Sequence, residues 1–273
     1  MKLTLAILLF CICWLPINVQ TQYFSVKKVK LDKQYSFPVF ANSSSPGSAK
    51  KINQLLQISE LEILSKHNKQ DFFRKISTDN GTIYGGKVAI SYQVESNNSK
   101  LLSVKFDQSS CGMTCHYWVK YYNFNAENGN LFQLQDLFTS EGLRVLKKYI
   151  AKKRIKQLHK EVAKLEQAEQ GDFSEIADYY KDDDLNDFYI NNNKLYIDGD
   201  NSFHKNLKFS GIETVCEFNL NEFKHHLNLF GKTIFKLNNA SIKNFQSSSF
   251  PQLYNGKIAN KDVIMVINTA YKD

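Results

Sequence analysis

Three consecutive segments in the middle of the chain alternate apolar and polar residues with a period of two, and this pattern restricts the possible folds most. The apolar positions of the first two segments are Val88, Ile90, Tyr92 and Val94, then Leu102, Val104 and Phe106. A period of two indicates half-buried β-strands. The turn sequence Asn97-Asn98-Ser99 between them predicts an antiparallel return, and residues 116–125 predict a third strand.

Two segments carry helical periodicity instead. Ser48 is predicted to cap a helix that runs to about His67, with Ile52, Leu55 and Leu56 on its buried face. A longer helix is predicted from about Ser140 to Glu169. Its apolar stripe comprises Leu143, Leu146, Ile150, Leu158, Val162 and Leu165.

The remaining predicted elements are short. A single entry strand is predicted in the segment 27–40, with its end at Pro38. Asn128-Gly129 is predicted to turn the chain into a strand over 131–134. Asn219 or Asn221 caps a short helix that bears Phe223, Leu227 and Phe230. Further strands are expected in a hairpin over 188–198, turned at 191–193, and at 215–218 and 263–267. The fold class is therefore α+β: antiparallel sheets with one long and two shorter helices.

The first residues resemble a secretory signal peptide. Lys2 precedes an apolar run from Leu3 to Ile17, which is shorter than the about 20 residues of a spanning helix. We expect cleavage near Thr21, and an uncleaved membrane anchor is the alternative. Cleavage lowers the net charge of +8 to +7, because Lys2 is the only charged residue removed. We expect a secreted or periplasmic chain with no stable membrane span in its mature form.

We divide the chain into four parts. Residues 1–21 are the signal peptide, 22–110 an N-terminal α+β part, 111–235 a C-terminal α+β domain, and 236–273 a tail that ends in a strand. Hydrophobic residues make up 42% and charged residues 23% of the chain. These values exclude a mostly disordered chain and a polytopic membrane protein.

Charge is concentrated on the long predicted helix and on the segment after it. The outer helix face carries basic residues, and an acidic stretch runs from Asp172 to Asp187. Either surface is a candidate contact for a charged partner. Most runs of charged residues, however, only keep one face of an element exposed to water. The candidate binding residues are Lys147, Lys148, Lys152, Lys153, Arg154 and Lys156 on the helix, and Asp182, Asp183 and Asp184 after it.

Three cysteines remain after cleavage, and two of them are expected to pair in an oxidising compartment. Cys111 and Cys115 can close a small loop, which leaves Cys216 as a buried thiol; the sequence alone does not decide which cysteine is free. A structural zinc site would need a second closely spaced ligand pair, and Cys216 and His225 are too far apart for one. We therefore predict no metal, no cofactor and no catalytic residue.

Several short motifs resemble a bacterial family. They are the strand and turn over 121–129, the pattern Leu134-Gln135-Asp136-Leu137-Phe138, the hairpin over 187–197, and the segment 211–220. In this order they resemble the RsiV-like extracytoplasmic domain family, which includes the lysozyme-sensing anti-sigma factor RsiV and the non-catalytic segment of the deacetylase PdaC. The resemblance covers roughly residues 30–235, and residues 47–57 resemble the first helix of the family.

The resemblance implies an α+β recognition module outside the cytoplasm. We expect neither a sigma-binding region nor a deacetylase domain, because little sequence precedes Leu3 or follows Phe235. The leading hypothesis is a non-catalytic envelope module that binds a lysozyme-like hydrolase, another envelope protein or a peptidoglycan-related fragment, and not nucleic acid. The alternatives are a small extracytoplasmic enzyme that uses the cysteine and histidine cluster with or without metal, and a structural envelope protein.

Overall fold

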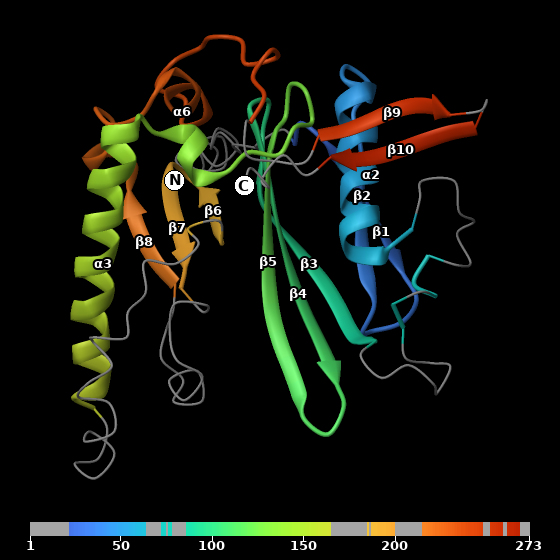
Figure 1. Ribbon diagram of the computed structural model, residues 1–273, viewed down its shortest axis with the longest axis horizontal. Coiled ribbons are helices and arrows are strands. Elements are labelled where there is room, and N and C mark those ends of the chain that lie inside the picture. Colours follow the sequence, from blue (N-terminus) through green and yellow to red (C-terminus); the bar gives the residue numbers. More distant parts are fainter. Residues whose placement is uncertain are drawn as a thin grey trace, which may run out of the picture.

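The computed structural model describes residues 22–63, 72–74, 76–77, 86–164, 185, 187–199, 215–247, 252–258 and 261–267. The fold is α+β with antiparallel sheets, as predicted (Figure 1). The predicted signal peptide and Asp182–Asp184 lie outside the described residues. In the described part of the chain no helix is long and apolar enough to cross a membrane.

A long three-stranded antiparallel sheet lies at the centre of the molecule. It comprises β3 (Lys87–Asn97), β4 (Leu101–Cys111) and β5 (Cys115–Asn125), in that order. Leu102, Val104 and Phe106 on β4 are all fully buried, which confirms the half-buried strand predicted from their spacing. The other face of β4 carries Leu101, Ser103 and Lys105, so the two faces of this sheet meet two different sets of elements.

The first face packs against α2 (Pro46–Leu61) and against a two-stranded sheet of β1 (Ser25–Lys30) and β2 (Ser36–Ala41). The prediction of one strand over 27–40 was wrong, because the chain reverses at residues 31–34, where Asp32 accepts hydrogen bonds from the amides of Gln34 and Tyr35. Helix α2 also begins two residues before Ser48, with Pro46 in its first turn. The predicted buried residues Ile52, Leu55 and Leu56 are confirmed.

A second hydrophobic core lies on the other face. It is formed by a three-stranded sheet of β6 (Phe188–Asn191), β7 (Lys194–Asp198) and β8 (Val215–Asn219), covered by the helix α3 (Ser140–Val162) and by α6 (Leu229–Ile234) (Figure 1). The predicted hairpin over 188–198 is confirmed, and its turn residues Asn192 and Asn193 both have positive φ. A two-stranded sheet of β9 (Gln252–Ile258) and β10 (Lys261–Ile267) follows, and its second strand was predicted.

Two short elements differ from the prediction. Residues 131–134 form one isolated bridge, Phe124 with Leu131, and then a 3-10 helix, Leu134–Leu137, instead of a strand. The short helix expected after Asn219 is replaced by a 3-10 helix, Leu220–Glu222, a turn, and then α6, which Asn228 caps through the amide of Gly231. In both places a short apolar run fits several structures, and tertiary contacts select one of them.

Candidate functional site

The lysine-rich face lies on α3, where Lys148, Lys152 and Lys156 are exposed and Lys147 and Lys153 are half-buried. The Nζ atom of Lys153 lies 4.5 Å from the centroid of the Phe218 ring and donates a hydrogen bond to the carbonyl of Glu217. Lys153 therefore attaches α3 to β8 through its side chain. Because the aspartates at 182–184 lie outside the described residues, their proximity to these lysines stays a prediction.

Arg154 does not belong to the outer face, and its assignment there was wrong. Its side chain is 1% exposed, and its Nη2 atom donates a hydrogen bond of 3.3 Å to the carbonyl of Ile197. Arg154 follows Leu146 and Ile150 at intervals of four residues, so the helix period places it on the buried stripe. Gly199 makes room for it, because a Cβ atom there would lie 1.4 Å from Nη1 of Arg154.

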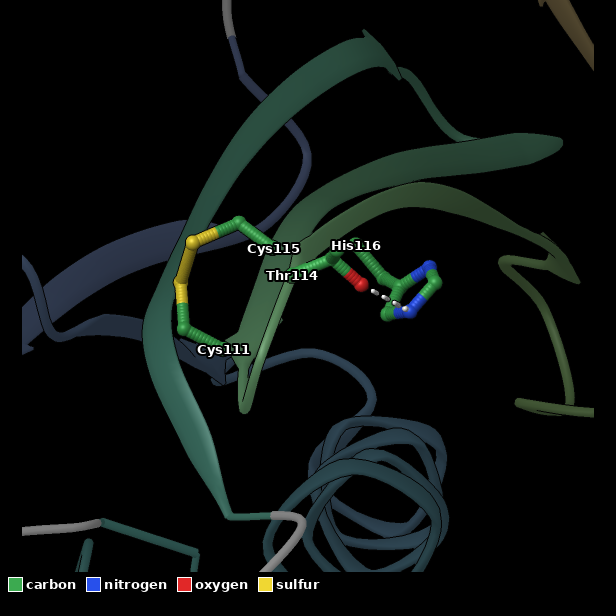
Figure 2. Close-up of a disulfide and its surroundings, with 4 residues drawn as sticks. All are labelled: Cys111, Thr114, Cys115 and His116. Carbon is green, nitrogen blue, oxygen red and sulfur yellow. Dashed lines mark hydrogen bonds between the residues drawn. A yellow bond between two sulfur atoms is a disulfide. The ribbon is translucent and has the colours of Figure 1, made fainter.

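The predicted disulfide joins Cys111 and Cys115 at the tip of the β4–β5 hairpin (Figure 2). Beside it, Oγ1 of Thr114 and Nε2 of His116 are 3.3 Å apart. Cys216 is a buried thiol in the second core, where its Sγ atom donates to Oε1 of Gln157 at 3.2 Å. The structure therefore does not bring Cys216 to the disulfide, and the described residues contain no group of His, Cys, Asp and Glu that could hold a metal ion.

Two tyrosines that the sequence analysis did not select form the centre of a better candidate. Tyr189 on β6 and Tyr196 on β7 are cross-strand partners whose rings are stacked, with centroids 4.5 Å apart and an interplanar angle of 4°. Each lies between two buried residues of its strand, so both rings are on the sheet face opposite the second core. The predicted hairpin and its alternation could have revealed this pair.

A third ring comes from the central sheet and could not have been found from local sequence. Tyr121 on β5 stacks on Tyr189, with a centroid distance of 5.5 Å and an interplanar angle of 16°. Its hydroxyl donates a 3.0 Å hydrogen bond to Oδ2 of Asp198. We call Tyr121, Tyr189 and Tyr196 the tyrosine stack. All three side chains are half-buried, so part of each ring reaches solvent.

Hydrogen bonds to the backbone of β6 fix the seam between the two sheets beside this stack. Nδ2 of Asn123 donates to the carbonyl of Phe188 at 2.7 Å, and Oγ of Ser96 donates to that of Ile190 at 2.6 Å. Asn123 is itself fixed by a 2.7 Å hydrogen bond from Oγ of Ser103. The relative position of Tyr121 and Tyr189 is therefore set by buried polar contacts, which makes the stack a preformed surface.

Carboxylates surround the tyrosine stack. Burial, followed by the charge of Glu95, raises the pKa of Tyr189 to about 12. Burial and then Asp198 raise the pKa of Tyr121 well above its ordinary value, and burial and then Glu217 raise that of Tyr196. All three rings are therefore neutral at physiological pH.

Glu95 connects the tyrosine stack to a neighbouring pocket. Burial raises the pKa of Glu95, although Lys105 and a hydrogen bond from Asn191 oppose this shift. The pocket has a volume of about 290 Å³ and lies between β3 and the β6–β7 turn. We call it the amide pocket, because six of its lining residues carry a side-chain amide: Gln22, Asn97, Asn98, Asn191, Asn192 and Asn193.

A separate polar cluster is buried in the first core. The carboxylate of Glu60, which is 0% exposed, accepts from Nζ of Lys87 at 2.9 Å and lies 3.3 Å from Nζ of Lys120. It also accepts a hydrogen bond from the hydroxyl of Tyr122, whose pKa is raised by burial and then by Glu60. These contacts join the end of α2 to β3 and β5, which indicates a structural role.

Comparison with known proteins identifies the fold and nothing finer. No protein-family profile and no curated protein sequence matches the chain. Among solved structures, the chain is similar to a member of the DUF3298 family from Bacteroides fragilis, with a TM-score of 0.54 and 12% identity over 81% of this chain and 99% of that one. A DUF3298 family protein from Pseudomonas aeruginosa gives a TM-score of 0.48 and 10% identity over 77% of this chain and 94% of that one. The similarity to the Bacteroides fragilis protein shows that this chain has the fold of a DUF3298 family member.

Proposed function

We propose that this protein is a secreted or periplasmic, non-catalytic binding module of the bacterial envelope that recognises a cell-wall fragment. The observation that carries the proposal is the tyrosine stack, which two sheets build at one seam. The resemblance of the sequence motifs to the RsiV-like family supports the location outside the cytoplasm.

The physical argument rests on what tyrosine rings offer to a ligand. A ring provides a large apolar surface with a negative face and a polar tip, at the cost of ordering few rotatable bonds. The C–H groups of a sugar ring are weakly positive and pack on such a face. In the stack the rings are already held by one another and by Asp198, so ligand binding orders little more of the protein.

A specific observation favours a second candidate ligand, a lysozyme-like hydrolase. Glu95, Asp198 and Glu217 place negative charge around the tyrosines, and a cationic protein would be steered toward that charge. Tyrosine is also among the residues that dominate protein–protein interfaces. However, Glu217 already pairs with Lys194 at 2.6 Å, which reduces the charge available to a partner. The cell-wall fragment is therefore the leading ligand.

The experiment compares Tyr189→Ala with Tyr117→Ala, which removes a tyrosine that is 77% exposed near the hairpin tip. Co-sedimentation with purified peptidoglycan sacculi and calorimetry with lysozyme would be run at low and high salt. We expect Tyr189→Ala to weaken sacculus binding by about tenfold or more, because Tyr121 and Tyr196 both stack on Tyr189 and lose this support when the ring is removed. Tyr117→Ala should bind like the unaltered chain.

Three results would decide against this proposal. If the protein binds neither sacculi nor lysozyme, it is not a binding module of this kind. If Tyr189→Ala and Tyr117→Ala have equal effects, the tyrosine stack is not the binding surface. Tight binding to lysozyme alone, weakened strongly by salt, would select the second candidate.

A further inference from the structure

The amide pocket combines an apolar floor with a polar rim. The floor includes Leu101, Ile190 and Ile234, each 2% exposed, and the rim carries side-chain amides together with Glu95 and Lys236. Its volume of about 290 Å³ is at the lower end of the ~300–1,000 Å³ of small-ligand pockets. The pocket therefore has room for one or two sugar rings and not for a folded partner.

Several polar groups of the rim remain available to a ligand. Asn97 uses its whole amide on the backbone of Phe24, but Asn98 uses only Oδ1, which accepts from the amides of Lys100 and Leu101. The Nδ2 donor of Asn98 makes no hydrogen bond with any residue that the structure describes. The same holds for the side-chain amides of Asn192 and Asn193, which lie at the exposed β6–β7 turn.

The charges of the rim cancel, and this property selects the class of ligand. Glu95 contributes one negative charge and Lys236 one positive charge, while the remaining available groups are neutral amides. An amide donates through its nitrogen and accepts through its oxygen, so the rim suits a neutral molecule rich in both donors and acceptors. An apolar floor below such a rim suits the C–H face of a pyranose ring.

We propose that the amide pocket is a binding site for a neutral, N-acetylated saccharide. This inference rests on the proposed function and specifies its ligand. Glu95 lies at the junction: it lines the pocket beside Asn191, and its charge acts on Tyr189 in the tyrosine stack. A saccharide that occupies the pocket can therefore continue over the tyrosine rings.

The test uses tri-N-acetylchitotriose as the probe and calorimetry as the measurement. Asn98→Asp keeps the Oδ1 acceptor that holds the local turn, replaces the Nδ2 donor with a carboxylate oxygen, and adds one negative charge. Asn192→Gly with Asn193→Gly removes both turn amides, and glycine keeps the positive φ of 48° and 60°. Asn98→Asp should lose about fivefold in affinity, the effect of one net hydrogen bond of about 1 kcal/mol, and the glycine double variant, which removes two amides, should lose at least as much.

The matched control is Asn221→Asp, an equivalent change at an exposed asparagine of the 3-10 helix that follows β8, which should leave the affinity unchanged. Retained affinity in both pocket variants, with thermal unfolding unaltered, would overturn the proposal, as would tighter binding of a charged trisaccharide such as trigalacturonate. If sacculi bind through Tyr189 but chitotriose does not bind, this inference fails while the proposed function stands. If sacculi bind without needing Tyr189, the proposed function fails instead.

Discussion

The buried carboxylate of Glu60 gives the sharpest test of what stabilises the first core. Replacement by glutamine keeps the shape of the side chain and one acceptor oxygen but removes the negative charge. In the folded chain this charge faces the ammonium groups of Lys87 and Lys120 and the hydroxyl of Tyr122. Glu60→Gln therefore leaves two cations at the site without their counter-charge.

The expected cost follows from the exposure of each partner. Breaking a buried ion pair by removing one member costs about 3–5 kcal/mol, because the remaining charge stays buried. Lys87 is only 16% exposed and carries most of this cost, although its Nζ atom retains a 2.7 Å hydrogen bond to the carbonyl of Glu60. Lys120 is 45% exposed, can turn toward water, and contributes less than about 1 kcal/mol. We expect a loss near the lower limit, about 3 kcal/mol.

Urea unfolding, followed by circular dichroism, measures this loss. The midpoint should fall while the slope with urea stays unchanged, which separates a change in stability from a change in the unfolded state. Lys120→Met is the weak control. The double variant Glu60→Gln with Lys87→Met should recover most of the loss, because no buried lysine is then left without a partner. A cost below about 1 kcal/mol for Glu60→Gln, or no recovery in the double variant, would refute this reasoning.

Three further predictions concern other parts of the fold. The free energy of unfolding should decrease as the pH rises above about 10. The unfolded tyrosines ionise there, while the raised pKa values of Tyr121, Tyr122 and Tyr189 keep these side chains protonated in the folded chain. Between about pH 9 and 11 the urea midpoint should therefore fall less in the double variant Tyr121→Phe with Tyr189→Phe than in the unaltered chain. Gly142→Ala should lower the unfolding temperature, because its Cβ atom would lie 2.3 Å from the carbonyl oxygen of His226, whereas a stabilised variant would show that α3 does not dock there. Cys111→Ser with Cys115→Ser should cost at most about 2 kcal/mol in urea unfolding, since the disulfide closes a loop with a sequence separation of 4; failure to fold would contradict this.

Sequence reasoning was most successful where local pattern and tertiary environment agree. The alternation around Ile90 and Val104 predicted β3 and β4, because one face of each strand meets a core. The asparagines at 191–193 predicted the β6–β7 turn, because asparagine tolerates the positive φ that a tight turn requires. The spacing of Cys111 and Cys115 allowed a small disulfide loop but left open which cysteine is free, and the structure pairs these two because they end paired strands of one hairpin.

Arg154 shows where residue type and period conflict. Its charge suggested solvent, but its spacing from Ile150 placed it on the buried stripe, and Gly199, which follows the end of β7, provides the space for the guanidinium. The prediction for Arg154 relied on its residue type and not on the helical period. A buried arginine is predictable only when the groups that receive it are known, and these come from β7, which local sequence does not connect to α3.

The amino-acid sequence by itself determined the class of the fold, most of the strands and both long helices, because these depend on periodicity and on residues close together in the chain. Only the tertiary structure decided the candidate site. Tyr121 and Tyr189 belong to different sheets, and Glu95 and Lys236 line one pocket from distant segments. Contacts of this kind arise when two sheets pack across a seam. The local pattern of apolar and polar residues does not indicate which sheet faces will pack together.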